Sequence, residues 1–573
     1  MTDMAATDAP VVRHFRQILM WPLQLMPLQP GSQVQRHWEH LDQCAGPNPW
    51  REVEDEFTSD PTEFQERHYR EFVTFLPHVQ RFLYGQGRSA VTRVGYGESP
   101  IRVFRRVDID KARLTYDDAV IDFAIKHVDL YFFYDMDVVI LVLEVHADNL
   151  PLARVQDTLF RFGRAFPTGW DADGTATHCM RNVQWLDTAG RVLGGSDFDN
   201  RARYLSYAGE HRSAGVGAHW QYLLRPMVQH HSDQVGPLRY RQLEYHRMPK
   251  ISYLAVDDPF ALSRDDFARL ATAARPDDGK VPPFPDPVVE RIERDFFYDR
   301  FWSPQRADPR AATRVTCDGH TMVMVGCARD PWFVDGDTGM LGQFRHQYFL
   351  VALIAHFHKA ALLLLSDRLV MAVSRLDIQD PESVLRFKLA IRQSLEIFLR
   401  FNHRYWFHEL SNQTMAKDLY ARFGRHLGND ELFHEVREEV LDMGQYLDSD
   451  DSRRQGEAVL RLTVVTILGL IGTIATGFLG MNLLAEADNP LMVKIVYFLA
   501  VFVPTTALTL LTVMKSRTLS EMLDAIGDDR LSWSTRLASL LRIARRQDPF
   551  TVPSAIKFLP IGRGRSKSRV NPD

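Results

Sequence analysis

Cysteine is scarce in this sequence. Four of the 573 residues are cysteines, and no two of them form a Cys-x-x-Cys pair. Their spacing excludes a disulfide framework and a zinc ribbon, because both need several cysteines at short, regular separations. It fits a reducing compartment. The four are Cys44, Cys179, Cys317 and Cys327.

Motifs of catalysis and export are also absent. The chain has neither a Walker phosphate-binding loop nor a Gly-x-Ser-x-Gly elbow. His408-Glu409 begins a zinc-protease motif, but Asn412 stands where the second histidine would be. The N-terminal residues lack a basic stretch followed by an apolar one, so we expect no signal peptide. The sequence predicts that the protein is not an enzyme and has no resident cofactor.

The formal net charge of −5 is small but unevenly divided. Residues 515–573 hold twelve Lys/Arg and six Asp/Glu, and so carry +6, which leaves −11 on the first 514 residues. An acidic body attracts cations, and a basic tail suits the anionic surface of a cytoplasmic leaflet. We therefore expect the tail to contact lipid headgroups and no nucleic acid.

Two long apolar runs follow one another near the C-terminus, in residues 459–482 and 491–514. Each has about 24 residues, which gives a helix of roughly 36 Å, enough to cross the ~30 Å hydrocarbon core of a bilayer. We predict a transmembrane hairpin joined by a short outer loop, residues 483–490. The alternative is a pair of buried core helices, which would normally be shorter and more amphipathic.

Charges beside the two runs predict the orientation of this hairpin. The connecting loop has two acidic residues, Glu486 and Asp488, and no basic one. Basic residues flank the other ends: Arg453, Arg454, Arg461, Lys515 and Arg517. Because basic residues concentrate on the cytoplasmic side, we expect a multi-pass protein with both termini in the cytoplasm.

The chain before the hairpin is predicted to combine α and β structure. We expect a cytosolic α/β domain in residues 1–275, a Pro-rich linker with the rest of that domain in 276–379, and long helices in 380–458. The predicted strands are 101–104 and 321–325, with a hairpin over 130–146; the predicted helices are 152–166, 288–301 and the strongly apolar 340–373. The predicted fold class is α+β, followed by stalk helices and a membrane hairpin.

Two long helices are predicted after residue 380. Asp380 is a suitable N-cap before Pro381, and Gly428 is a suitable C-cap for the first helix. The second helix is expected to run unbroken to Asn482, a length of roughly 80 Å, and so to form a stalk. Its first part carries apolar residues at coiled-coil-like spacing: Leu432, Val436, Val440, Met443 and Leu447.

One face of the first apolar helix is suited to line a pore. Threonine rings from several subunits could bind a hydrated ion, and rings of leucine and valine could close the path by dewetting. One hairpin cannot enclose a water-filled path, so a pore requires several subunits around an axis. This predicted pore face consists of Gly480, Gly477, Thr473, Leu470, Thr466, Leu462 and Val459. For Gly469 and Gly472 we favour close helix packing.

The outer end of this helix, Gly480-Met481-Asn482, is a candidate selectivity filter. Asn482 offers a neutral carboxamide with one acceptor oxygen. Mg²⁺ gives up its water shell reluctantly, so a ring of carboxamides and carbonyls can bind the hydrated ion through its waters. Carboxylates in the outer loop could raise the local cation concentration.

Gly480-Met481-Asn482 at the end of the penultimate membrane helix resembles the signature of the CorA family of divalent cation channels. The resemblance covers residues 380–514. It implies a homopentameric, funnel-shaped Mg²⁺ channel in the inner membrane of a bacterial cell. Asn482 would form the selectivity ring with support from the Gly480 carbonyl, Gly477 and Thr473 would line the pore, and Leu462 would form its inner hydrophobic neck.

The resemblance also implies regulation by cytosolic Mg²⁺ bound between subunits. Four acidic residues of the stalk, Asp442, Asp448, Asp450 and Asp451, form the candidate regulatory site, although an acidic helix face is more often simply solvated. Two alternatives stay open: a Zn²⁺, Co²⁺ or Ni²⁺ transporter of the same fold, and a membrane-anchored cytosolic protein with a sensory or interaction role.

Overall fold

The computed structural model describes residues 10–26, 36–42, 48–53, 66–85, 100–134, 136–243, 246–276, 284–305, 308–377, 380–480 and 490–514. The chain divides into two compact units, Met1–Gly444 and Gln445–Asp573, which we treat separately. The first unit contains a large mixed β-sheet followed by helices. This confirms the α+β class.

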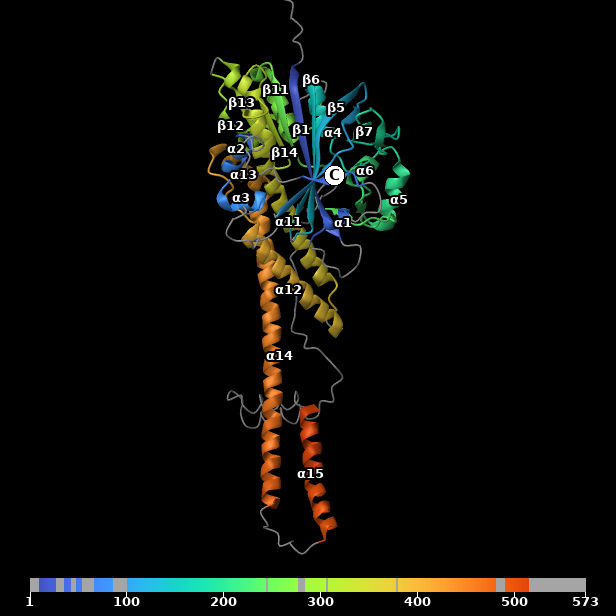
Figure 1. Cartoon of the computed structure of the whole chain (residues 1–573), viewed down its shortest axis with the longest axis vertical. Coiled ribbons are helices and arrows are strands. Elements are labelled where there is room, and N and C mark those ends of the chain that lie inside the picture. Colours follow the sequence, from blue (N-terminus) through green and yellow to red (C-terminus); the bar gives the residue numbers. More distant parts are fainter. Residues whose placement is uncertain are drawn as a thin grey trace, which may run out of the picture. The chain divides into compact units, whose positions relative to one another are not determined.

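Fourteen strands of the described residues form one sheet (Figure 1). Its main path runs β12-β13-β14-β11-β1-β6-β5-β4-β7-β8, while β3 and β2 extend from β5, and β10 and β9 from β1. The pairs β11–β14 and β9–β10 are parallel, and the other pairs are antiparallel. The strands are β1 Val11–Met26, β2 Trp50–Glu52, β3 Ile101–Arg106, β4 Lys111–Thr115, β5 Val120–Phe133, β6 Val138–Pro151, β7 Asn182–Leu186, β8 Val192–Gly195, β9 Val228–Gln229, β10 Arg239–Gln242, β11 Lys250–Val256, β12 Phe297–Phe301, β13 Thr313–Cys317 and β14 Thr321–Cys327.

The central strands are buried on both faces. The first eight residues of β6, Val138–Val145, are all buried, as expected of a strand covered on two sides. Leu143 joins a core cluster with α4, whereas its neighbours Val142 and Glu144 face a cavity shared with α11. Successive side chains thus point to opposite faces of the sheet. The predicted hairpin over 130–146 and the predicted strands at 101–104 and 321–325 are confirmed.

Strands from both sides of the predicted Pro-rich linker share this sheet. β11 precedes the linker and β14 follows it, yet Lys250–Val256 pairs with Thr321–Cys327 along its whole length. Most of the linker itself, residues 277–283, lies outside the described part. The sequence on both sides therefore contributes to one core.

Helices of the first unit lie on both sides of the sheet, and α12 packs on α11 below it (Figure 1). They are α1 Glu39–Asp42, α2 Glu66–Thr74, α3 Pro77–Tyr84, α4 Leu152–Arg161, α5 Arg201–His211, α6 Ala218–Leu224, η1 Pro259–Ala261, α7 Arg264–Thr272, α8 Asp286–Phe296, η2 Pro309–Ala311, α9 Pro331–Val334, α10 Met340–Gln343, η3 Phe344–Tyr348, α11 Phe349–Ser374, α12 Pro381–Arg404 and α13 Thr414–Leu427.

Two predicted helices are too long. The helix predicted over 152–166 ends at Arg161, because Phe162 is extended and Gly163 has a φ of 87°. A side chain at Gly163 would also lie 2.9 Å from Leu19. The helix predicted over 288–301 ends at Phe296, and Phe297–Phe301 instead forms strand β12 against β13.

The strongly apolar helix predicted over 340–373 is confirmed as the continuous run α10-η3-α11. By length and composition it could cross a membrane, but 78% of its most apolar window is buried inside the chain. It packs against β1, β6, α12 and α13. His358 within it donates to the Tyr405 carbonyl over 2.6 Å and contacts the Tyr420 hydroxyl. We therefore interpret this run as a core helix.

The single helix predicted between residues 380 and 427 is wrong, because α12 ends at Arg404 and α13 begins at Thr414. Tertiary contacts explain the break. The Tyr405 hydroxyl donates to the Tyr134 carbonyl over 2.8 Å, and the Ser411 hydroxyl donates to the Thr74 carbonyl over 2.5 Å. The predicted ends are confirmed: Asp380 accepts two N-cap hydrogen bonds, and Gly428 is left-handed with a φ of 66°.

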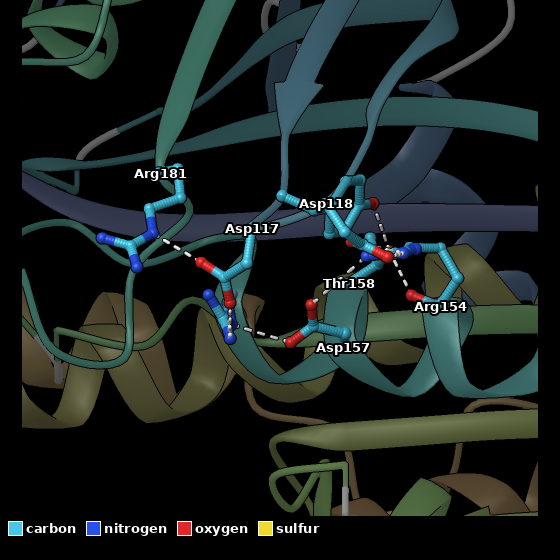
Figure 2. A network of polar contacts seen from close by, with 8 residues as sticks. Asp117, Asp118, Arg154, Asp157, Thr158 and Arg181 are labelled. Carbon is cyan, nitrogen blue, oxygen red and sulfur yellow. Dashed lines mark hydrogen bonds and ion pairs between the residues drawn. The ribbon is translucent and has the colours of Figure 1, made fainter. Parts of the chain in front are cut away.

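A polar network joins the turn between β4 and β5 to helix α4 (Figure 2). Arg154 donates to Asp118 over 2.7 Å, and Arg161 contacts both Asp117, at 2.9 Å, and Asp157, at 2.7 Å. Burial raises the pKa of Asp157, although both arginines oppose this. The pairs with Asp117 and Asp118 are exposed at the carboxylate and contribute little individually, whereas the pair of Arg161 with Asp157 is largely buried. We assign the network a structural role, because it ties this turn to α4.

Candidate pore-lining helix

Two helices contain the predicted membrane hairpin. Helix α14 spans Asn429–Gly480, and α15 spans Leu491–Met514. The predicted unbroken helix is confirmed to Gly480, and the helix predicted over 491–514 has the expected bounds. Met481, Asn482 and residues 483–489 lie outside the described part of the chain.

The predicted stripe in the first part of α14 is partly buried. Val436 and Val440 are fully buried, whereas Leu432 is half-buried. Next to this stripe, Phe433 stacks on Trp406 with ring centroids 4.3 Å apart. In the described structure, these residues anchor the start of α14 to the first unit.

One side of α14 within the second unit is covered. Val464 is 4% exposed, and Leu460 and Leu468, one turn away on either side, are half-buried. A Cβ atom built on Gly472 would lie 3.0 Å from Cγ2 of Thr505 in α15. The interpretation of Gly472 as a packing glycine therefore fits a close approach of the two helices.

The predicted pore face lies on the other side of α14. At about 100° per residue, its seven positions fall within one arc about 80° wide, on the side of the helix roughly opposite Val464. Each of the seven is exposed in the single chain. The aliphatic members are 61–67% exposed: Val459, Leu462 and Leu470.

The threonine hydroxyls on α14 donate to the helix backbone. Thr466 donates to the Leu462 carbonyl and Thr473 to the Gly469 carbonyl, each over 2.8 Å. A hydroxyl has one hydrogen and two lone pairs, so these groups have acceptor capacity left. The waters around a cation point their hydrogens outward. The two threonines thus present the polarity that a hydrated cation requires.

The glycines of α14 differ in their surroundings. Unlike at Gly472, a Cβ atom built at Gly469, Gly477 or Gly480 would have no described atom within 4 Å apart from those of its chain neighbours and of the helix's own backbone. Packing against the described residues therefore explains Gly472 but not the other three glycines. At Gly477 and Gly480 the helix presents bare backbone on the predicted pore face.

The candidate regulatory aspartates stay a prediction. Asp442 and Asp448 are exposed on α14, and the side chains of Asp450 and Asp451 are outside the described part. Among the described residues, no group of three or more His, Cys, Asp or Glu side chains is arranged to hold a metal ion.

Comparison with known protein families and with curated proteins gives no match.

A second candidate site has no signature in the sequence. A cavity of about 470 Å³ lies in the first unit between the sheet and the helices α2, η3 and α11. Its lining residues come from segments as far apart as Ile18 and Leu350. A weak sign of this site in the sequence is the group of polar residues Lys126, His127 and Asp129 on β5, just before the apolar residues Leu130–Phe133.

Proposed function

We propose that the chain is one subunit of a passive channel for divalent cations, with Mg²⁺ as the preferred ion. In this proposal α14 and α15 cross the cytoplasmic membrane of a bacterial cell, and both termini are cytoplasmic. Several copies, five by the family resemblance, surround a central path lined by α14. The ion gradient and the membrane potential drive transport without covalent chemistry.

The observation that carries this proposal is the uncovered, threonine-bearing face of α14. Apolar side chains are normally buried, yet this face exposes Val459, Leu462 and Leu470, and α15 exposes Leu491 and Met492. Exposed apolar patches of this kind are typical of membrane or subunit contacts. Because α15 packs near Gly472, whose direction lies about 120° around the helix from the centre of this face, the face is left free for an axis of symmetry.

The order of residues along this face suggests a mechanism. A ring of Asn482 would accept hydrogen bonds from the water shell of the ion, with the Gly480 carbonyls close by. Thr473 and Thr466 would offer further acceptor oxygens along the path. The rings of Leu470, Leu462 and Val459 lack polar groups, so water would leave a narrow path there and the ion would stop.

Flux into liposomes tests this proposal. The purified full chain should admit Mg²⁺, and Asn482→Ala should change the ratio of Mg²⁺ flux to Co²⁺ and Ni²⁺ flux, because the ring that contacts the water shell is removed. Thr473→Val should lower Mg²⁺ flux severalfold. Thr476→Val is the matched control, since Thr476 makes the same type of backbone hydrogen bond but lies one turn after Gly472, on the side of α14 that approaches α15 and outside the arc of the seven pore positions.

Three outcomes would contradict the channel: no flux of any divalent ion, no effect of Asn482→Ala on any flux, or a monomeric mass in detergent. Preferred flux of Zn²⁺, Co²⁺ or Ni²⁺ would instead favour the transporter of the same fold. The cavity in the first unit gives specific support to a different function, a membrane-anchored protein that senses a small ligand. Absent flux together with ligand binding would favour that function.

A further inference from the structure

The cavity in the first unit has an irregular strand on one wall. Ile125 of β5 pairs with Val145 of β6, but the next pair is His127 with Glu144, so Lys126 is an extra residue in a β-bulge. Neighbouring residues of a regular strand point to opposite faces. Here Lys126 and His127 both line the cavity. Bulges frequently re-aim side chains beside functional sites.

The facing wall has an irregular helix. Phe344–Tyr348 forms a π-helical turn between α10 and α11, and it places Arg345 and His346 at the cavity. Such turns are rare and frequently lie at functional sites. Two independent departures from regular structure therefore turn polar side chains into one cavity from opposite sides.

Most acidic groups of the cavity already have a partner. Asp129 forms a two-point contact with Arg105 at 2.8 and 2.9 Å. Glu144 accepts from Arg345 over 2.7 Å and has Arg16 at 3.8 Å. These pairs satisfy the buried carboxylates, so they are poor candidates for holding a metal ion.

A third carboxylate, Glu71, is also engaged. It accepts from the Tyr84 hydroxyl over 2.7 Å and lies 3.1 Å from Nδ1 of His346. The acidic residue that lines the cavity outside these contacts is Asp337. The negative charges of the cavity are thus largely neutralised by its own residues.

Two basic groups are left facing the cavity. Lys126 and Arg67 line it, and neither forms an ion pair with an acid among the described contacts. Two ring nitrogens, Nδ1 of His127 and Nε2 of His346, are buried and have no hydrogen-bond partner within the described structure. The described structure supplies no partner for these two ring nitrogens. Because leaving buried polar nitrogens without partners costs free energy, a bound ligand that accepts hydrogen bonds would stabilise the site.

We propose that this cavity binds a small anion that carries a phosphate or carboxylate group, held by Lys126 and Arg67, by Nδ1–H of His127, and by Nε2–H of His346 in its doubly protonated form, whose Nδ1–H is on Glu71. Arginine and lysine are the usual partners of such groups. The volume of about 470 Å³ fits a small organic anion. This inference does not depend on the proposed channel.

Calorimetric titration of the purified full chain tests the proposal, with inorganic phosphate and citrate as separate probes at constant ionic strength. At least one probe should bind saturably, with one site per chain. The double variant Lys126→Gln, Arg67→Gln should weaken that binding at least tenfold. Arg70→Gln is the matched control, because Arg70 lies on the same helix but pairs with Glu66 and does not line the cavity.

A third variant distinguishes a specific loss of binding from a loss of folding, because it is expected to bind more tightly. Asp337→Asn removes a negative charge from the lining without removing a donor, so it should tighten binding of the anion. Binding of phosphate alone assigns a phosphate ligand, and binding of citrate alone assigns a carboxylate. The proposal is overturned if neither probe binds saturably, or if the double variant and Asp337→Asn both bind as the wild type does.

Discussion

The chain holds apolar helices in two different environments. The run α10-η3-α11 has a longer apolar stretch than α14 or α15. The sheet and the helices α12 and α13 nevertheless cover it. After residue 458 of α14 and in α15, most described apolar side chains are exposed within the single chain, Val464 being buried. The difference teaches that apolar length alone does not identify a membrane span. The deciding observation is whether other parts of the same fold cover the helix.

The largest effect should come from core truncation. Leu353 of α11 is fully buried, so Leu353→Ala should lower the free energy of unfolding of the first unit by ~2–5 kcal/mol. Leu470→Ala should change it by less than ~0.5 kcal/mol, because Leu470 is exposed. Chemical denaturation followed by tryptophan fluorescence measures both. Equal losses would break the distinction between the two environments.

A smaller effect should separate two glycines of α14. Gly472→Val should destabilise the pairing of α14 and α15 by ~1–3 kcal/mol, since even its Cβ atom would lie 3.0 Å from Cγ2 of Thr505, closer than ordinary van der Waals contact. Gly477→Val should leave that pairing intact, because its Cβ atom would lie within 4 Å of no described atom of α15. Thermal unfolding in detergent measures the difference. If the two variants behave alike, the assignment of packing and open faces fails.

The stability of the first unit should depend on pH because a histidine, His358, is buried in α11. Burial lowers the pKa of His358 to about 3, below the ordinary value of about 6.5. Between these values the unfolded chain binds more protons than the folded chain, so stability should fall as the pH drops from 6.5 towards 3. The slope from this one group is at most ~1.4 kcal/mol per pH unit.

His358→Gln is the test of that slope, because glutamine keeps a donor but does not titrate in this range. The variant should show a flatter decline of melting temperature below pH 6.5 than the wild type. The sequence has no histidine in residues 459–514, so the apolar parts of α14 and α15 should not contribute. An unchanged slope would mean that His358 is accessible to protons in the folded state.

Local signals in the sequence predicted much of the fold. The cap at Asp380, the glycine at Gly428 and the hairpin over 130–146 each depend on neighbouring residues, and each is confirmed. The break after Arg404 depends instead on contacts with Tyr134 and Thr74, more than 270 residues away. No glycine or proline marks it, so the sequence contained no signal for it.

The candidate sites also differ in whether local sequence or long-range contacts determine them. The face of α14 follows from helical periodicity, and the described structure exposes the positions that periodicity selects. The polar cavity follows from a bulge in β5 and a π-turn before α11, both of which depend on the partners of those segments. Neither irregularity can be read from the order of residues alone.

One measurement tests the central claim most directly, that the exposed face of α14 lines an ion path. A positively charged thiol reagent is applied to liposomes containing Thr473→Cys in a background where Cys44 is replaced by serine; Cys179, Cys317 and Cys327 are buried. We predict that the reagent abolishes Mg²⁺ flux through Thr473→Cys and leaves flux through Thr476→Cys unchanged. Equal inhibition of both, or undiminished flux with Thr473→Cys, would contradict the claim.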